Sequence, residues 1–375
     1  DANSGNTVDF NVMVHKIHTG GDNPEVEDGG EYAIWGFRNT KHDYSDVLYP
    51  QDTVNCRKCH DGTDPETPDG DNWKNVPSEA ACGSCHEAPP NFADLTAAEI
   101  ETAHVTPNAT PNNPNLPAGV PVIEYVLNSA TVDGANQAAI NFQILRDGVP
   151  LDLINLPADL TAATNRPSFL LAYAQDQDGI TEPAEYNNLG RSSAQPQSVS
   201  LSNVDSLDDN GDGTFTATIA SAFPAGAKMR AVGLQGYFQV DTDGDGNADY
   251  PLHTPSAVVA VSGDDARREV VDNNSCANCH EWFEGHGGNR VFNMNICTLC
   301  HVPNLSSSGR SITNPSASLV NELTAANIDG VDPNDPLTYP EATNNFTDMI
   351  HGIHGGGERT TDYEFVRGGR QGYYN

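Results

Sequence analysis

The middle of the chain alternates short apolar runs with turn residues. β-Branched and aromatic side chains gather in runs that clusters of Gly, Pro, Asn and Asp separate. The runs cover residues 121–132, 138–148, 168–175, 197–204, 213–223, 229–240 and 256–263. Short strands at this spacing are typical of an all-β domain, and we expect an antiparallel sandwich or a Greek-key barrel.

The two ends of the chain have a different pattern. Helical spacing of apolar residues occurs in short stretches, such as 92–104 and 317–328, with Asp94 and either Ser316 or Ser318 as candidate N-caps. Most of the remaining sequence there is polar and rich in loop-forming residues. The pattern predicts that the β domain lies between two loop-rich, partly helical segments.

A proline- and asparagine-rich stretch, TPNATPNNPNLPAGVP at 106–121, marks one boundary. The length of 375 residues suits two or three domains. We expect an N-terminal segment over 1–105, a linker over 106–120, the β domain over 121–265 and a C-terminal segment over 266–375.

All eight cysteines belong to one motif, Cys-x-x-Cys-His, which occurs four times. This is the attachment site of a c-type haem, in which both thiols bond to the haem and the histidine ligates its iron. Four zinc sites are the alternative, but tetrahedral sets give no role to a histidine directly after each second cysteine. The sequence therefore predicts four covalent haems. Their attachment residues are Cys56 and Cys59, Cys82 and Cys85, Cys276 and Cys279, Cys297 and Cys300, and their proximal ligands are His60, His86, His280 and His301.

The second axial position of each iron decides the chemistry. An open position permits reactions of a small ligand, whereas a filled one favours electron transfer. Eight histidines remain beyond the four motifs, and six are good distal candidates: His15, His18, His104, His286, His351 and His354. We expect no iron ligation by His42 and His253, which lie in polar, strand-like contexts. With histidine in surplus, we expect bis-histidine, low-spin haems of low potential in preference to methionine ligation.

Four of these candidates belong to an internal repeat. DFNVMVHKIHTGG (9–21) and NFTDMIHGIHGGG (345–357) are identical at seven of thirteen positions. His-x-x-His on a helix places two imidazoles on one face, where each can serve a different haem. A surface pair or a zinc site is the alternative, but no third metal ligand is obvious nearby.

The haem regions resemble the decahaem surface cytochromes of metal-reducing bacteria, the OmcA/MtrC type. The resemblance is carried by residues 31–60 with 81–86, and by 267–301 with 349–357. It covers about half the chain and implies alternating β and multihaem domains, electron transfer to extracellular acceptors, and distal roles for His286, His351 and His354, and likewise for His15, His18 and His104. The chain departs from the family in having four haem motifs, and in lacking a cysteine pair in its β domain.

An acidic loop in the β region is a candidate calcium site. In DTDGDGNADY (241–250), Asp241, Asp243, Asp245 and Asp249 have the alternating spacing of a calcium-binding loop. The twelfth-position glutamate of an EF-hand is absent, because that position is Leu252. A hairpin turn rich in Asp and Gly is the alternative.

Charge and hydropathy restrict location and partners. The chain has 52 acidic and 18 basic residues, a formal charge of −34, which disfavours nucleic acid and anionic membranes and suits cationic partners and metal ions. No apolar run approaches the roughly 18 residues of a membrane-spanning helix, and no signal peptide is visible. Because c-type haems are attached outside the cytoplasmic membrane, we expect an extracellular or cell-surface protein.

These features favour an electron conduit that is not itself an enzyme, with redox proteins or extracellular acceptors such as metal oxides as partners. The alternatives are a multihaem redox enzyme with an open haem site, and a truncated fragment of a longer surface cytochrome that acts as a terminal metal reductase. Four haems need four distal histidines, and six candidates are present. We therefore expect the surplus pair to ligate haems of another copy in a head-to-tail assembly or filament, or haems of a longer protein.

Overall fold

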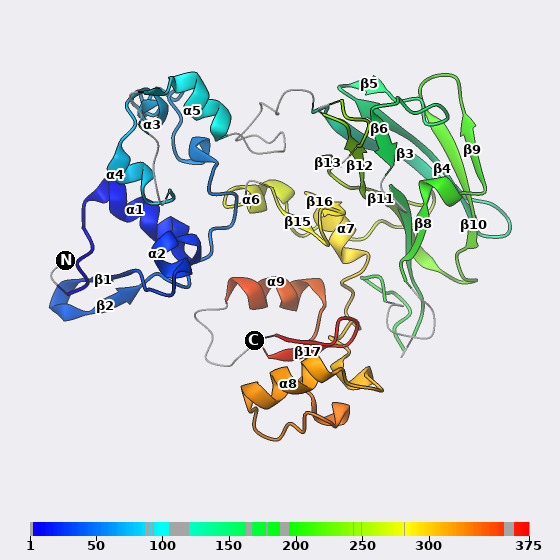
Figure 1. Cartoon of the computed structure of the whole chain (residues 1–375). Coiled ribbons are helices and arrows are strands. Elements are labelled where there is room, and N and C mark those ends of the chain that lie inside the picture. Colours follow the sequence, from blue (N-terminus) through cyan, green and yellow to red (C-terminus); the bar gives the residue numbers. More distant parts are fainter. Residues whose placement is uncertain are drawn as a thin grey trace. The chain divides into compact units, whose positions relative to one another are not determined.

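The computed structural model describes residues 3–86, 91, 94–104, 120–162, 167–177, 179–187, 195–242, 244–248, 250–280, 282–355 and 364–374. The chain forms two compact units (Figure 1). Unit 1 joins Asp1–Pro121 to Asn274–Phe283, and unit 2 joins Val122–Asn273 to Glu284–Asn375. The third haem motif, 276–280, therefore belongs to unit 1 although it follows the β domain in sequence.

Unit 2 contains a β-sandwich whose strands pair antiparallel within three sheets (Figure 1). The first sheet has the order β3-β4-β10-β9, with β5 paired to β4; the second has the order β14-β11-β7-β8; the third has the order β13-β12-β6. Phe142 of β4 meets Phe169 of β7 edge to face at 5.2 Å between ring centroids, so the inner faces of the first two sheets share one core. The strands are β3 Ile123–Val132, β4 Gln137–Arg146, β5 Val149–Pro150, β6 Leu160–Ala162, β7 Ser168–Ala174, β8 Gln197–Ser200, β9 Ser206–Asp209, β10 Phe215–Ala222, β11 Lys228–Gln235, β12 Tyr237–Val240, β13 Tyr250–His253 and β14 Ala257–Ala260.

The predicted fold class is confirmed. Each of the seven apolar runs contains a strand, and of the two architectures expected it is the sandwich that forms, because the described strands close no barrel. The run 229–240 splits into β11 and β12 at Gly236, whose φ of +96° turns the backbone into a conformation that glycine adopts readily. The sequence did not indicate four short strands, β5, β6, β9 and β13; β9 carries two aspartates, and β5 and β13 each carry a proline.

The fourth haem motif packs against this sandwich. Helix α7, Met294–Thr298, precedes Cys300, and the fully buried Ile296 and Leu299 lie in one apolar cluster with Leu170 of β7 and Ala231 of β11. Further elements of unit 2 are β15 Glu284–Gly285, β16 Arg290–Val291, α8 Ala317–Ala326, α9 Phe346–His354, β17 Phe365–Arg367 and β18 Gly372–Tyr374. A second small core joins α8 to the β17–β18 hairpin.

Unit 1 is mostly loops and short helices. Its elements are α1 Phe10–Thr19, α2 Pro24–Glu27, β1 Ala33–Trp35, β2 Lys41–Asp43, α3 Asn72–Asn75, α4 Glu79–Cys82 and α5 Ala97–Ala103, together with the part of α6, Asn273–Ala277, that belongs to it. Thr96, not Asp94, caps α5, since its hydroxyl accepts from the Glu99 N–H and the Glu99 side chain accepts from the Thr96 N–H. Only four apolar side chains in the described part of unit 1 are buried, so side chains alone do not form a core of ordinary size.

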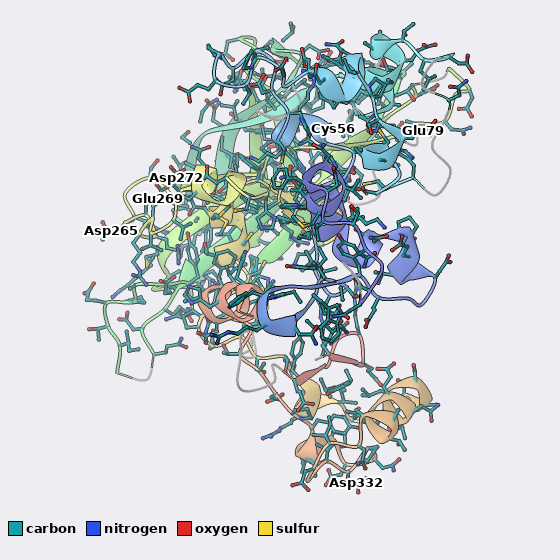
Figure 2. All side chains as sticks on the ribbon, turned by 90° about the vertical axis from the view of Figure 1, so that its left-hand side faces the viewer. Cys56, Glu79, Asp265, Glu269, Asp272 and Asp332 are labelled. Atoms are coloured by element: carbon teal, nitrogen blue, oxygen red, sulfur yellow. The ribbon has the colours of Figure 1, made fainter. Side chains whose placement is uncertain are left out.

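The acidic excess lies at the surface. Asp265, Glu269 and Asp272, on the segment between β14 and α6, are exposed (Figure 2), and no described Asp or Glu is fully buried. Among the residues that the structure describes, no helix is both long and apolar enough to cross a bilayer.

Candidate haem-binding sites

All four motifs fold in the same way. In each, the histidine N–H donates to the carbonyl of the first cysteine four residues earlier, at 2.9 or 3.0 Å. This single helical turn places the first cysteine and the histidine on the same side of the backbone. All eight cysteines are free thiols, and each motif can therefore present two sulfurs and one imidazole to a common partner.

Three proximal histidines lie opposite a predicted distal histidine. The ring centroids are 6.0 Å apart for His15 and His60, 6.0 Å for His104 and His86, and 6.2 Å for His286 and His301. A metal–imidazole bond is about 2 Å long and the ring centre lies about 1 Å further on, so two imidazoles on opposite sides of one metal have centres roughly 6 Å apart. These three spacings suit an iron between the rings.

Several ring orientations are fixed by backbone carbonyls. His18, His104 and His354 each place Nδ1 2.7–2.9 Å from the carbonyl four residues earlier in their own helical turn. Proximal His280 and His301 bond through Nδ1 to the carbonyls of Pro50 and Asn344, both at 2.8 Å. A carbonyl accepts only from a protonated Nδ1, which leaves the Nε2 lone pair available to a metal.

The remaining proximal histidine, His280, approaches the same stretch of chain as His18. His280 contacts the Pro50 carbonyl, and the ring of the preceding residue, Tyr49, meets His18 edge to face at 5.8 Å between centroids. Gln51 and Lys58 also donate to the carbonyls of Cys279 and Ala277. These contacts hold the third motif within unit 1.

Burial favours the neutral form of several of these imidazoles. It lowers the pKa of His60 and of His301. Burial, followed by the charges of Arg290 and other nearby cations, lowers the pKa of His286 to about 4. A neutral ring is the form that binds a metal, because protonation occupies the second nitrogen.

Unit 1 also contains buried polar atoms that lack hydrogen bonds. Among the described residues, His15 Nδ1, Trp73 Nε1 and Ser84 Oγ have no partner. Ser84 lies between the cysteines of the second motif, and the Trp73 ring is 5.7 Å from His104. Unpaired buried polar atoms are rare in folded proteins. Together with the scarcity of buried apolar side chains, they fit a large group with apolar faces and polar edges, as a haem has.

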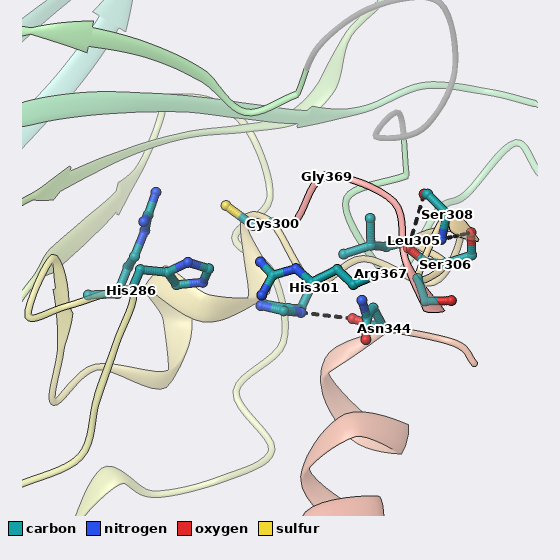
Figure 3. Close-up of a pocket in the computed structure, with 11 residues that line it drawn as sticks. His286, Cys300, His301, Leu305, Ser306, Ser308, Asn344, Arg367 and Gly369 are labelled. Carbon is teal, nitrogen blue, oxygen red and sulfur yellow. Dashed lines mark hydrogen bonds between the residues drawn. The ribbon is translucent and has the colours of Figure 1, made fainter. Parts of the chain in front are cut away.

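The fourth motif borders a hollow of about 270 Å³ in unit 2 (Figure 3). His286, Cys300 and His301 line it, and Figure 3 shows the Arg367 side chain reaching from β17 alongside His301. Arg290 of β16 also lines it. The sequence did not predict a role for these arginines; for Arg367 the available signal was Val-Arg-Gly-Gly-Arg at 366–370 in a chain with few basic residues.

The other candidates lie elsewhere. His351 and His354 are exposed on α9, whose N-cap is Asn345. His42 is exposed on β2, and His253 bonds to Glu284 at 2.7 Å. In the acidic loop, the Asp241 carboxylate accepts from the N–H groups of Gly244 and Gly246, while positions 243 and 249 lie outside the described residues. The described residues contain no group of three or more side chains suited to a metal ion, so the calcium site stays a prediction.

A family model matches more than half of the chain. The family model described as outer membrane cytochrome MtrC/MtrF-like, domains II/IV, matches residues 1–114 and 268–371. These ranges contain all four Cys-x-x-Cys-His motifs and exclude the β-sandwich. A search of curated proteins found no match.

Proposed function

The chain belongs to the MtrC/MtrF-like family of outer-membrane cytochromes, and we propose that it carries four bis-histidine c-type haems that relay electrons outside the cell. Family membership itself supports c-type haems, an electron-transfer role and a location at the cell surface. The number of haems, their ligands and their continuation between subunits are our proposals.

The observation that carries the proposal is the set of three imidazole pairs at 6.0–6.2 Å. We assign His15 to the haem of His60, His104 to that of His86, and His286 to that of His301. For the haem of His280 we assign His18, because both histidines contact the stretch Tyr49–Pro50. Each of the four haems then has one histidine on each face.

When bound, each haem takes up and releases one electron at its iron. The two histidines assigned to each haem would ligate its iron and would thereby exclude water and substrates from the metal. The carbonyl contacts at Nδ1 hold His18, His104, His280 and His301 in fixed orientations. Helix α1 lies beside the second attachment site, since the Thr19 hydroxyl is 3.3 Å from the sulfur of Cys85. The first attachment site is also near the second: burial raises the pKa of Cys56 most, and the charges of Cys85 and Cys82 raise it further.

The experiment is a haem count combined with the spin state of single-histidine variants. Intact mass should show four covalent haems, and the absorption and paramagnetic resonance spectra should be entirely low-spin. His15→Ala, His18→Ala, His104→Ala and His286→Ala should each convert one haem to high-spin. His42→Ala is the matched control and should change nothing, because His42 is an exposed histidine on β2.

Two results would contradict the proposal. A mass that corresponds to fewer than four haems would refute the proposed number. A high-spin haem in the unaltered protein would indicate an open iron site and favour a redox enzyme.

The histidine pair on α9 supports a continuation of the haem chain. α9 repeats α1 in structure: Asp9 and Asn345 cap the two helices, and His18 and His354 make the same bond to the carbonyl four residues earlier. The N-terminus of α9 contacts the fourth motif, because the Phe346 N–H donates to the His301 carbonyl at 3.1 Å. The assignments above leave both α9 histidines without a haem from the four motifs.

We therefore propose that His351 and His354 ligate haems of a second copy in a head-to-tail association. Such a contact is heterologous and gives an open filament unless the rotation closes. Mass photometry and electron microscopy should show chains of subunits that His351→Ala with His354→Ala shortens to monomers. An unaltered size distribution in the double variant would refute the association.

A further inference from the structure

The fourth haem site differs from the others in its charge. Two arginines, Arg290 from β16 and Arg367 from β17, line the hollow beside His286 and His301. They come from separate elements of unit 2 and converge on one site. None of the described residues that line the hollow is acidic, although acidic residues outnumber basic ones nearly threefold in the chain.

Three cations near the motifs of unit 1 are paired with carboxylates, whereas Lys58 of the first motif donates to the Ala277 carbonyl. Arg57, within the first motif, and Lys74 both bind Glu101, and Lys16 of α1 binds Glu25 at 2.5 Å. In contrast, Arg367 makes no ion pair with any carboxylate of the described residues. No carboxylate of the described part of the chain therefore neutralises the positive charge that Arg367 brings to the hollow.

A haem brings such a group, because every haem carries two carboxylates at one edge. Arginine binds a carboxylate through two parallel N–H···O bonds and keeps its charge at any physiological pH. We propose that Arg367, with Arg290, binds the carboxylate edge of the haem at Cys297–His301 and raises its reduction potential. This inference rests on the proposed function, since it needs a haem at the fourth motif.

The direction of the effect follows from electrostatics. Reduction adds one negative charge to the haem, and a nearby guanidinium stabilises that charge while also offsetting the haem carboxylates. The haem at the fourth motif should therefore accept electrons more readily than it would without the two arginines. Arg290 and Arg367 act as positioning and tuning residues because their effect reaches the iron through the haem edge.

The test is a redox titration of Arg367→Gln in the haem-loaded protein, followed by absorption and paramagnetic resonance. The wave of the fourth haem is identified as the one missing from Cys297→Ala with Cys300→Ala, which cannot attach it. In Arg367→Gln, we expect the equilibrium constant for reduction of this haem to fall by roughly tenfold, which is about 59 mV for one electron. Adding Arg290→Gln should enlarge the shift.

Two variants control for charge and for structure. Arg146→Gln makes the same change in net charge in unit 2, but Arg146 is paired with Asp159 at 2.6 Å and does not line the hollow. It should leave the wave in place. Arg367→Lys keeps the positive charge, so the reduction potential of the fourth haem should stay close to its value in the unaltered protein.

The outcomes separate this inference from the proposed function. Four low-spin haems with an unshifted fourth wave in Arg367→Gln would refute the role of Arg367 and leave the proposed function intact. An equal shift in Arg146→Gln would also refute it, because net charge would then be sufficient. A fourth motif without haem in the unaltered protein would refute both.

Discussion

We expect Gly233→Ala and Leu299→Ala to destabilise the protein less in combination than the sum of their separate effects. Gly233 lies on β11. A Cβ built there would be 2.7 Å from Cδ1 of Leu299 and 2.6 Å from Cδ1 of Ile296. These contacts are closer than carbon atoms tolerate, so a methyl group at this position would force the ends of both side chains to shift.

The structure gives the size of each effect. Leu299→Ala removes a fully buried side chain, which costs about 2–5 kcal/mol in core positions. Gly233→Ala overpacks the same site and costs about 1–3 kcal/mol. In the double variant, the methyl group and a shifted Ile296 side chain enter the space that Leu299 leaves. The loss of unfolding free energy in the double variant should then be smaller than the sum of the two single losses by about 0.5–3 kcal/mol.

Chemical denaturation followed by far-ultraviolet circular dichroism measures the three free energies of unfolding. Leu299→Ala leaves the Cys-x-x-Cys-His motif intact, so all variants should attach their haems. Leu337→Ala is the control, because this leucine is exposed and its truncation should cost less than about 0.5 kcal/mol. Additive effects in the double variant, or a Leu299→Ala cost no larger than that of the control, would refute the packing argument.

Three further results are expected. Thr96→Ala should destabilise α5 by about 1 kcal/mol through loss of its cap, and it should increase the high-spin signal because His104 follows this helix directly. Hydrogen bonds from Arg230 lower the pKa of Asp264. Asp264→Asn should therefore cost about 1.5–3 kcal/mol at pH 7, and this difference should disappear as titration takes the pH below about 4 and through the folded-state pKa. A fragment of residues 121–265 should give a β-type circular dichroism spectrum but unfold at lower denaturant concentration than one that continues through α7, whose Ile296 covers the sheet.

Local patterns were sufficient to predict much of the fold. The seven apolar runs predicted strands because alternating polarity and β-branched residues are features of a short stretch of sequence, which favour a strand without reference to distant residues. The repeat around His15 and His351 predicted two similar helices, and α1 and α9 share their caps and their histidine contacts. The predicted N-cap of α5 was two residues early because Asp94 and Thr96 are both good caps, and only Thr96 has a glutamate three residues later.

Contacts between residues that are far apart in the sequence could not be predicted from local patterns. His15 meets His60 across 45 positions, and no spacing rule relates them. The third motif follows the β domain in sequence, yet Gln51 and Lys58 hold it in unit 1. The arginines of the fourth site come from β16 and β17, more than 70 residues apart, so their convergence depends on the tertiary fold.

The two units differ in how many apolar side chains they bury. Unit 1 has four buried apolar side chains among its described residues, and the haems that we propose for its motifs would supply most of its interior. Unit 2 has a complete sandwich, and its single motif uses Leu299, one of the two variable positions between the cysteines, to pack against β11. Folding of unit 1 should therefore depend on haem attachment, whereas the sandwich should fold before it. The sandwich would then support the fourth haem that we propose, at the hollow lined by Arg290 and Arg367.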